Sequence, residues 1–346
     1  MALAAGGKTG AQPARLACIG AGRMGRGIAH AAAYAGHEVV LLDAKPRDAG
    51  EFAAFKADAL AEVESGLAML AGLGAFDAST ISAIMALISV HPLEAAEAAL
   101  AGVEIVFEGV PETREAKADA FALFDRAAAP GAILASTTST MLSTELAALT
   151  ERPERFLNAH WLNPAFLVPL VELSPTDQTD PAVLVRLKDV LVGIGKVPVT
   201  CRAAPGYIVP RIQMLAMNEA ARIVEEGVAS AEDVDKAVIY GFGLRFAVLG
   251  LLEFIDWGGG DILAYASRYM TEATGELRYA APDIVERNMA EGRIGLRTGQ
   301  GFYDYRNRDA GAFRREKLGA FVQMLQHQGL MKPPMTRAGK PSGDAE

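Results

Sequence analysis

The chain has 346 residues, of which 51% are hydrophobic and 22% charged, and its formal net charge is −9. This length is enough for two domains with separate cores. The acidic balance argues against a surface for nucleic acid or for an anionic membrane, because both need a basic face. Only two cysteines occur, Cys18 and Cys201, and they lack the spacing of metal ligands. We therefore expect neither a disulfide framework nor a metal site.

The N-terminal segment, residues 1–14, has no continuous apolar stretch. We expect a disordered leader there and not a signal peptide. The longest apolar runs elsewhere, such as residues 246–252, are too short to cross a bilayer. Together these features predict a cytoplasmic protein without a membrane partner.

A G-x-G-x-x-G motif at residues 20–25 lies between an apolar run at 16–19 and a helical segment. Each glycine has a mechanical reason: Gly20 permits a tight turn, Gly22 lets a pyrophosphate approach the backbone, and Gly25 lets helix and strand pack closely. The N-terminus of the helix then faces the anion. The alternative is a glycine-rich turn in some other α/β protein. The predicted cofactor-binding residues of this loop are Gly20, Gly22, Arg23, Met24 and Gly25.

A second apolar run, residues 37–42, ends in Asp43, 23 residues after Gly20. Asp43 would accept hydrogen bonds from the adenosine ribose, and its carboxylate would repel a 2′-phosphate. This favours NAD over NADP as cofactor. Lys45 and Arg47 are close enough in sequence to accommodate that phosphate, so NADP stays the second possibility.

Strands and helices alternate over the next hundred residues. We expect helices at 46–70 and 79–87, strands at 88–91, 105–109 and 132–136, a helix after Glu112, and a helix at 142–149 with Ser143 or Thr144 as its N-cap. This alternation predicts a doubly wound, mostly parallel sheet of the Rossmann type. Ligands bind such sheets at the carboxyl ends of the strands, where Ser139 and His160 fall.

His160 and Glu172 are twelve residues apart. A strand ending at His160, a turn at residues 163–164 and a second strand at 169–173 would let the two side chains meet. A carboxylate can then accept one imidazole N–H, fix the tautomer, and leave the other ring nitrogen free as a general base. The spacing predicts an acid/base dyad.

After a helix at 181–195 and a strand at 197–200, only helical periodicity follows, at 208–227 and 231–240. Met214 and Met217 fit the core face of the first of these helices. The sequence thus predicts an α/β domain followed by an all-α domain. The expected divisions are the leader at 1–14, a Rossmann-type domain at 15–203, a helical substrate and dimerisation domain at 204–306, and a C-terminal helix with a polar tail at 307–346.

Several separated motifs resemble, in order, those of the L-3-hydroxyacyl-CoA dehydrogenases. The matching stretches are the glycine loop, Glu112 with Lys117 and Phe121, Ala135 to Ser139 with Thr137 in place of the usual Asn, His160 to Pro164, Val171-Glu172, Pro205 to Val209, and Thr298 to Tyr303. This resemblance covers roughly residues 16–305.

The resemblance implies an NAD-dependent enzyme. His160 would take the proton of the substrate 3-hydroxyl, Glu172 would orient His160, and Ser139 would hydrogen-bond the oxygen being oxidised. Asn163 would help to position the acyl carbonyl or the active-site network. Glu112 and Lys117 would contact the cofactor, and a homodimer would form through the helical domain.

Two departures bear on the substrate. Pro210 stands where the family has an Asn, although Gln213 could substitute for it, and the segment between Arg47 and Arg114 holds one cation, Lys56. The phosphates of coenzyme A normally need more Lys or Arg around them.

Residues 243–253 and 169–173 resemble the branch that contains L-gulonate 3-dehydrogenase, or lambda-crystallin, and the carnitine-oxidising enzymes. Arg245 in the first segment is either a clamp on a free carboxylate or part of a salt bridge.

The sequence favours NAD-dependent oxidation of an L-3-hydroxyacyl-CoA. A free 3-hydroxy acid, such as L-gulonate or carnitine, is the alternative substrate. A non-catalytic, structural NAD-binding protein is the remote alternative. No nucleic-acid partner is expected.

Overall fold

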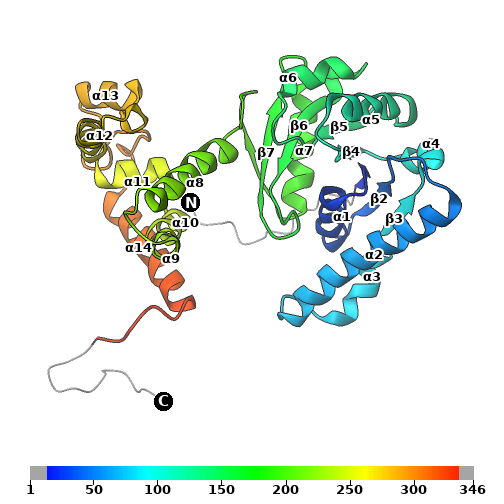
Figure 1. The fold of residues 1–346 in the computed structure, drawn as a ribbon, viewed down its shortest axis with the longest axis horizontal. Coiled ribbons are helices and arrows are strands. Elements are labelled where there is room, and N and C mark those ends of the chain that lie inside the picture. The colour runs from blue at the N-terminus through cyan, green and yellow to red at the C-terminus, as the bar shows by residue number, and fades with distance from the viewer. Residues whose placement is uncertain (1–13, 335–346) are drawn as a thin grey trace. The chain divides into compact units, whose positions relative to one another are not determined.

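The computed structural model describes residues 14–334 (Figure 1). Nearly all of the expected leader and the end of the polar tail therefore lie outside the described residues. The chain divides into two compact units, Met1–Ala216 and Met217–Glu346. The division falls within one helix, α8 (Val209–Glu225). The two units are described in turn.

The first unit is built on an eight-stranded sheet with the order β3-β2-β1-β4-β5-β6-β7-β8. Every neighbouring pair is parallel except β6 and β7. The strands are β1 (Arg15–Ile19), β2 (Glu38–Leu42), β3 (Ile88–His91), β4 (Ile105–Glu108), β5 (Ile133–Ser136), β6 (Phe156–Trp161), β7 (Leu170–Pro175) and β8 (Val197–Thr200). This confirms the predicted doubly wound, mostly parallel sheet.

Helices cover both faces of the sheet (Figure 1). They are α1 (Arg23–Tyr34), α2 (Ala49–Gly72), α3 (Ile81–Met85), α4 (Ala96–Leu100), α5 (Arg114–Ala127), α6 (Ser143–Leu146) and α7 (Pro181–Gly193). Alternate residues of β1 show the two layers: Leu16 shares a core with α1, α2 and α7, whereas Ala17 shares a core with α4, α5 and α6. Strands buried on both faces explain the near-continuous apolar runs in the sequence.

The predicted N-cap of the helix after β5 is wrong. The N-cap position is Leu142, and α6 extends only to Leu146 before a 3₁₀ turn takes over. Ser143 is buried, and its hydroxyl lies 3.1 Å from the hydroxyl of Ser174 on β7. Because it bonds across to the sheet, it does not cap the helix.

The second unit is helical. Its elements are α9 (Ala231–Ala237), a π-helix (Val238–Gly243), α10 (Leu244–Val248), α11 (Leu251–Gly258), α12 (Gly260–Thr274), α13 (Asp283–Ala290) and α14 (Ala310–His327). Between residues 217 and 334 the only β pairing consists of isolated bridges at 295–304. A small core forms around Leu296, Tyr305 and Phe313. This confirms the predicted change from α/β to all-α structure.

Asp256 organises the segment at 298–303 that resembles the closing motif of the family. Its buried carboxylate accepts hydrogen bonds from the backbone N–H groups of Phe302 and Tyr303, both at 2.9 Å. A Cβ at Gly301 would lie 2.0 Å from that carboxylate, so only glycine fits there. Asp256 is thus structural. Within residues 14–334 no group of three or more His, Cys, Asp or Glu side chains is arranged to hold a metal.

The expectation that Met214 and Met217 face a core is wrong. Each is 62% exposed in the single chain. Helix α8 has no buried side chain at all. Its apolar side chains are therefore not buried by any element within residues 14–334.

Among the described residues, no single helix has the length and apolar character needed to cross a membrane. One pair, Ala231–Val248 with Leu251–Gly258, reaches that length and composition only when its two members are taken together, and it is bent by 90°.

Candidate active site

The glycine loop has the shape that a dinucleotide requires. Gly20 has a φ of +101°, and a Cβ there would lie 2.8 Å from the backbone of Gly109. A Cβ at Gly25 would lie 2.2 Å from the carbonyl oxygen of Gly20. At Gly22, by contrast, a Cβ would meet nothing within 4 Å. Two of the glycines thus allow the backbone to pack closely, and the third leaves open space at the N-terminus of α1, where a pyrophosphate can bind.

A cavity of about 770 Å³ extends from this loop. It is lined by Gly20, Gly22, Asp43, Arg47 and Val110, among others. Asp43, at the end of β2, is 3% exposed and accepts a 2.5 Å hydrogen bond from Nε of Arg47. Arg47, which the sequence offered as a partner for a 2′-phosphate, is therefore engaged by a carboxylate. These features fit NAD. The glycine loop is open for the pyrophosphate, the cavity is large enough for a dinucleotide, and Asp43 at the end of β2 can accept hydrogen bonds from the ribose.

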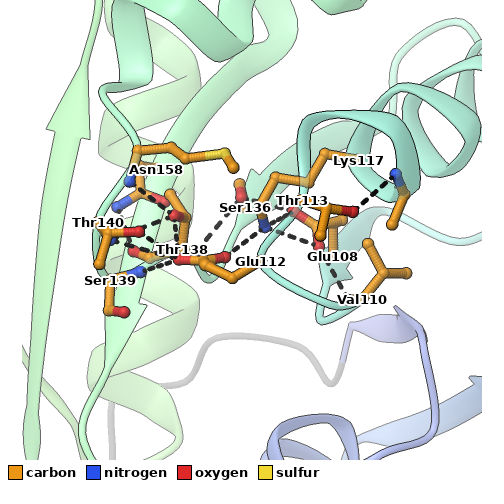
Figure 2. Close-up of polar contacts among 12 residues, drawn as sticks. Glu108, Val110, Glu112, Thr113, Lys117, Ser136, Thr138, Ser139, Thr140 and Asn158 are labelled. Carbon is orange, nitrogen blue, oxygen red and sulfur yellow. Dashed lines mark hydrogen bonds and ion pairs between the residues drawn. The ribbon is translucent and has the colours of Figure 1, made fainter.

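An ionic cluster surrounds the buried ammonium group of Lys117, close to the segment 109–111 that lines the cofactor cavity (Figure 2). Lys117 on α5 is 1% exposed, and its ammonium group contacts the carboxylate of Glu108 at 3.0 Å and that of Glu112 at 3.0 Å. Glu108 also accepts a 2.6 Å hydrogen bond from the hydroxyl of Ser136. The ammonium of Lys117 thus joins the end of β4 to the loop that follows it.

Glu112 fixes the segment that carries Ser139 (Figure 2). Its Oε1 accepts from the backbone N–H of Ser139 at 2.8 Å and from the hydroxyl of Thr138. Burial acts to raise the pKa of Glu112, but the Thr138 hydrogen bond and the Lys117 ammonium outweigh burial and lower the pKa to about 2. Ser139 itself is exposed, so the backbone of its segment is held while its side chain stays accessible.

His160 and Glu172 meet as expected from the sequence. They are register partners across the antiparallel β6–β7 pair, and Nδ1 of His160 lies 2.8 Å from Oε2 of Glu172. Both side chains are buried. Because a carboxylate only accepts, the proton of this hydrogen bond belongs to Nδ1. The geometry therefore leaves Nε2 as the basic ring nitrogen.

The second oxygen of Glu172 holds the start of α8. Oε1 accepts from the backbone N–H groups of Ile208 at 2.9 Å and Val209 at 2.8 Å. These two N–H groups lie at the N-terminus of α8, where backbone N–H groups have no acceptor within the helix. Pro210, the second residue of α8, needs no such bond, which explains why the helix tolerates proline there. Sequence analysis missed this connection, because nothing in the local pattern links residues 172 and 208.

Tyr207 packs beside the dyad. Its ring centroid lies 5.8 Å from that of His160, and its hydroxyl donates a 2.7 Å hydrogen bond to the carbonyl oxygen of Met141. Its φ of 43° is in the left-handed region, which costs a non-glycine residue about 1 kcal/mol or more. The strained backbone lets the aromatic ring cover the imidazole.

The loop between β6 and β7 carries Asn163 and is fixed from two sides. Lys196 is 6% exposed, and its ammonium donates to the carbonyl oxygens of Ala165 at 2.5 Å and Val168 at 2.8 Å. The ring of Phe166 stacks on His30 of α1, with centroids 4.4 Å apart and an interplanar angle of 3°. Lys196 was also missed from the sequence, since a lysine before a strand gives no signal that it is buried.

The remaining predicted residues lie in three places. Arg23 and Asn163 line a second cavity, of about 380 Å³. Met24 packs against the core of the sheet. Arg245 belongs to the second unit, on α10, where its guanidinium lies 4.7 Å from the centroid of the Phe254 ring. No salt bridge to Arg245 is present within residues 14–334.

The sequence matches two descriptions of one protein family. Residues 15–204 match "3-hydroxyacyl-CoA dehydrogenase, NAD binding domain" and residues 206–305 match "3-hydroxyacyl-CoA dehydrogenase, C-terminal domain". The chain belongs to the 3-hydroxyacyl-CoA dehydrogenase family. It is accordingly an NAD-dependent oxidoreductase that acts on a CH–OH group.

The relatives of this chain are named for different substrates. The chain is 34% identical over 300 residues to 3-hydroxybutyryl-CoA dehydrogenase of Bradyrhizobium diazoefficiens, covering 84% of this chain and 95% of the relative. It is 30% identical over 310 residues to 5-formyl-3-hydroxy-2-methylpyridine 4-carboxylate 5-dehydrogenase of Mesorhizobium japonicum, covering 89% and 96%. A solved structure of a 3-hydroxyacyl-CoA dehydrogenase from Archaeoglobus fulgidus aligns with a TM-score of 0.71 at 28% identity, covering 92% of this chain and all of that one.

Replacing Glu172 by Gln tests the dyad. The amide keeps an oxygen for the N–H groups of Ile208 and Val209, but its NH₂ cannot accept the Nδ1 proton. We expect kcat to fall by about 10² to 10⁴, because the wrong imidazole tautomer is favoured. Steady-state kinetics with saturating NAD measure the effect, and the Kd of NADH should stay unchanged. A loss of less than about threefold would contradict the role of Glu172.

The low pKa of Glu112 predicts a specific dependence of stability on pH. A carboxyl whose pKa is lower in the folded state stabilises the fold above its ordinary value of 4.5, and this stabilisation is lost as the pH falls toward about 2. The urea midpoint of the wild type should exceed that of Glu112→Gln at pH 7, and the gap should narrow below pH 4.5. Glu115→Gln, an exposed change in the first turn of α5 three residues further on, is the control. A gap that does not vary with pH would refute this assignment.

Replacing Lys196 by Met tests the anchoring of the β6–β7 loop. Two carbonyl groups lose their donor, so we expect the free energy of unfolding to fall by about 1–3 kcal/mol. Lys188→Met on α7 is the matched control and should change it by less than about 0.5 kcal/mol. Urea unfolding followed by tryptophan fluorescence measures both. Equal effects of the two substitutions would rule out the anchoring role.

Proposed function

We propose that His160 is the general base of an NAD-dependent oxidation of a 3-hydroxy substrate. The observation that supports this most is the 2.8 Å contact of Nδ1 with Glu172, which leaves Nε2 free to accept a proton. When bound, NAD accepts a hydride at its nicotinamide ring. Nε2 takes the hydroxyl proton as the hydride leaves the same carbon, and the carboxylate of Glu172 stabilises the imidazolium that forms. A positioned base of this kind contributes about 10² to 10⁴ in rate.

Other residues of the first unit position the substrate in this proposal. Ser139, whose exposed side chain lies on a segment held by Glu112, donates to the oxygen being oxidised. Asn163 orients the carbonyl group of the substrate from the loop that Lys196 anchors. Glu112 and Lys117 lie on the cofactor side of the site. Glu112, which Lys117 holds by an ion pair, fixes the backbone of residues 138–140. Arg245, the candidate clamp from the second unit, is proposed on sequence resemblance alone.

A CoA thioester is the first substrate candidate, because relatives such as the Bradyrhizobium enzyme carry that name. A free hydroxy acid is the second, and two observations favour it. Helix α2 carries Glu51, Asp58, Glu62 and Glu64 but a single lysine, which suits the phosphates of coenzyme A poorly. The Mesorhizobium relative, of similar identity, is named for a pyridine carboxylate.

We also propose a homodimer in the cytoplasm. Helix α8 exposes Ile212, Leu215 and Met217 by 41%, 67% and 62%. Helix α12 exposes Ile262 and Tyr265 by 62% and 60%. Apolar area of this extent typically marks a protein interface. Two free cysteines are consistent with a reducing compartment.

The proposed function is tested by NADH formation at alkaline pH. L-3-Hydroxybutyryl-CoA, L-gulonate, L-carnitine and free L-3-hydroxybutyrate are supplied at equal concentration to the wild type and to His160→Gln. We expect turnover on at least one of them and a fall in kcat of about 10² to 10⁴ in the variant. A wild type that binds NADH tightly but oxidises none of them would support the non-catalytic alternative.

A further inference from the structure

The cavity of about 380 Å³ is separate from the cofactor cavity and shares no lining residue with it. Its walls come from α1, α2 and the β6–β7 loop. Asn163, three residues after His160 on the loop that follows β6, is one of the lining residues. The side chains that carry charge or hydrogen-bonding groups here are Arg23, Arg26, His30, Glu62 and Asn163.

One positive charge in this cavity is not compensated. Arg26 forms an ion pair with Glu62, and its Nε donates to the carbonyl oxygen of Ala21. Arg23, on the first turn of α1, is exposed and has no carboxylate partner within residues 14–334. Burial and the nearby Lys196 ammonium lower the pKa of His30 to about 4, so this imidazole is neutral at pH 7. The net charge of the lining groups is therefore +1.

The other polar groups of the wall are already satisfied or suit a small ligand. The carbonyl oxygen of Ala165 is bonded to Lys196 and needs nothing from a ligand, whereas Nε2 of His30 is buried without a hydrogen-bond partner among the described residues. The stacked rings of Phe166 and His30 give one apolar wall. Asn163 supplies an amide at the other end. A cavity with one free guanidinium, one amide and one apolar wall complements a compact monoanion, because its net charge of +1 matches a single carboxylate.

We propose that this cavity binds the carboxylate of a free hydroxy-acid substrate, and that Arg23 is the residue that selects it. This inference rests on the proposed function in its free-acid form. Arg23 was expected from the sequence to contact the cofactor, whereas its side chain lines this cavity and not the one beside Asp43. A guanidinium offers two parallel N–H groups to a carboxylate, which gives orientation as well as affinity. Among the described lining residues, Arg26 is paired to Glu62, and Arg23 is left as the one uncompensated charge for a substrate carboxylate.

The test compares an acid with its uncharged amide. The variant is Arg23→Gln, and the matched control is Arg114→Gln, an exposed arginine that also begins a helix. L-3-Hydroxybutyrate and L-3-hydroxybutyramide are used both in turnover and in calorimetric binding to the NADH complex. We expect Arg23→Gln to lower kcat/KM and affinity for the acid by about 10- to 100-fold. The amide should be affected less than about twofold, and Arg114→Gln should change neither.

Other outcomes would overturn the assignment. An equal loss on acid and amide would make Arg23 structural. A raised Kd for NADH with unchanged affinity for the acid would return Arg23 to the cofactor. The wild type could instead oxidise only the CoA thioester. If Arg23→Gln then lowered kcat/KM for the CoA thioester but not for the pantetheine thioester, Arg23 would be assigned to a phosphate group of coenzyme A. The binding measurement needs no turnover, so failure of the proposed function and failure of this inference remain distinguishable.

Discussion

The buried carboxylate of Glu172 connects the parts on which the site depends. One oxygen binds the imidazole of His160, and the other binds two backbone N–H groups at the start of α8. Removing the carboxylate would leave the buried imidazole N–H and two partly buried backbone N–H groups without a partner, at up to about 1–3 kcal/mol each. The chemistry of the site and the entry into the helical part of the chain are thus held by the same side chain. This is possible only because β7 runs antiparallel to β6 and brings residue 172 opposite residue 160.

A second constraint comes from the close backbone packing at the glycine loop. Gly25 lets α1 approach the turn, and Gly20 lets the turn approach the end of β4. The same approach brings Val110 to the wall of the cofactor cavity. Close by in sequence, Lys117 lies between the carboxylates of Glu108 and Glu112. A buried lysine between two acids is compatible with folding because each partner has further hydrogen bonds that replace water.

Sequence reasoning succeeded where a local pattern has a single physical cause. The glycine spacing, the acidic residue at the end of β2 and the alternation of apolar runs with helices led to the sheet, and the His160–Glu172 pairing followed from two strands joined by a turn. It failed where the partner of a side chain comes from a distant segment. Ser143 bonds to Ser174 instead of capping a helix, Met214 and Met217 are exposed, and the buried position of Lys196 was not foreseen. Such choices depend on tertiary contacts that no local window contains.

The cluster of Glu108, Lys117 and Ser136 also has a consequence for how the sheet assembles. Glu108 and Ser136 are direct register partners on β4 and β5, and Glu108 is fully buried. Successive side chains of a strand point to opposite faces, so a slip of one residue would turn the carboxylate of Glu108 into the apolar layer that surrounds Phe107. An unpaired buried charge of that kind costs several kcal/mol. This charge therefore favours one alignment of the central strands and disfavours the neighbouring ones.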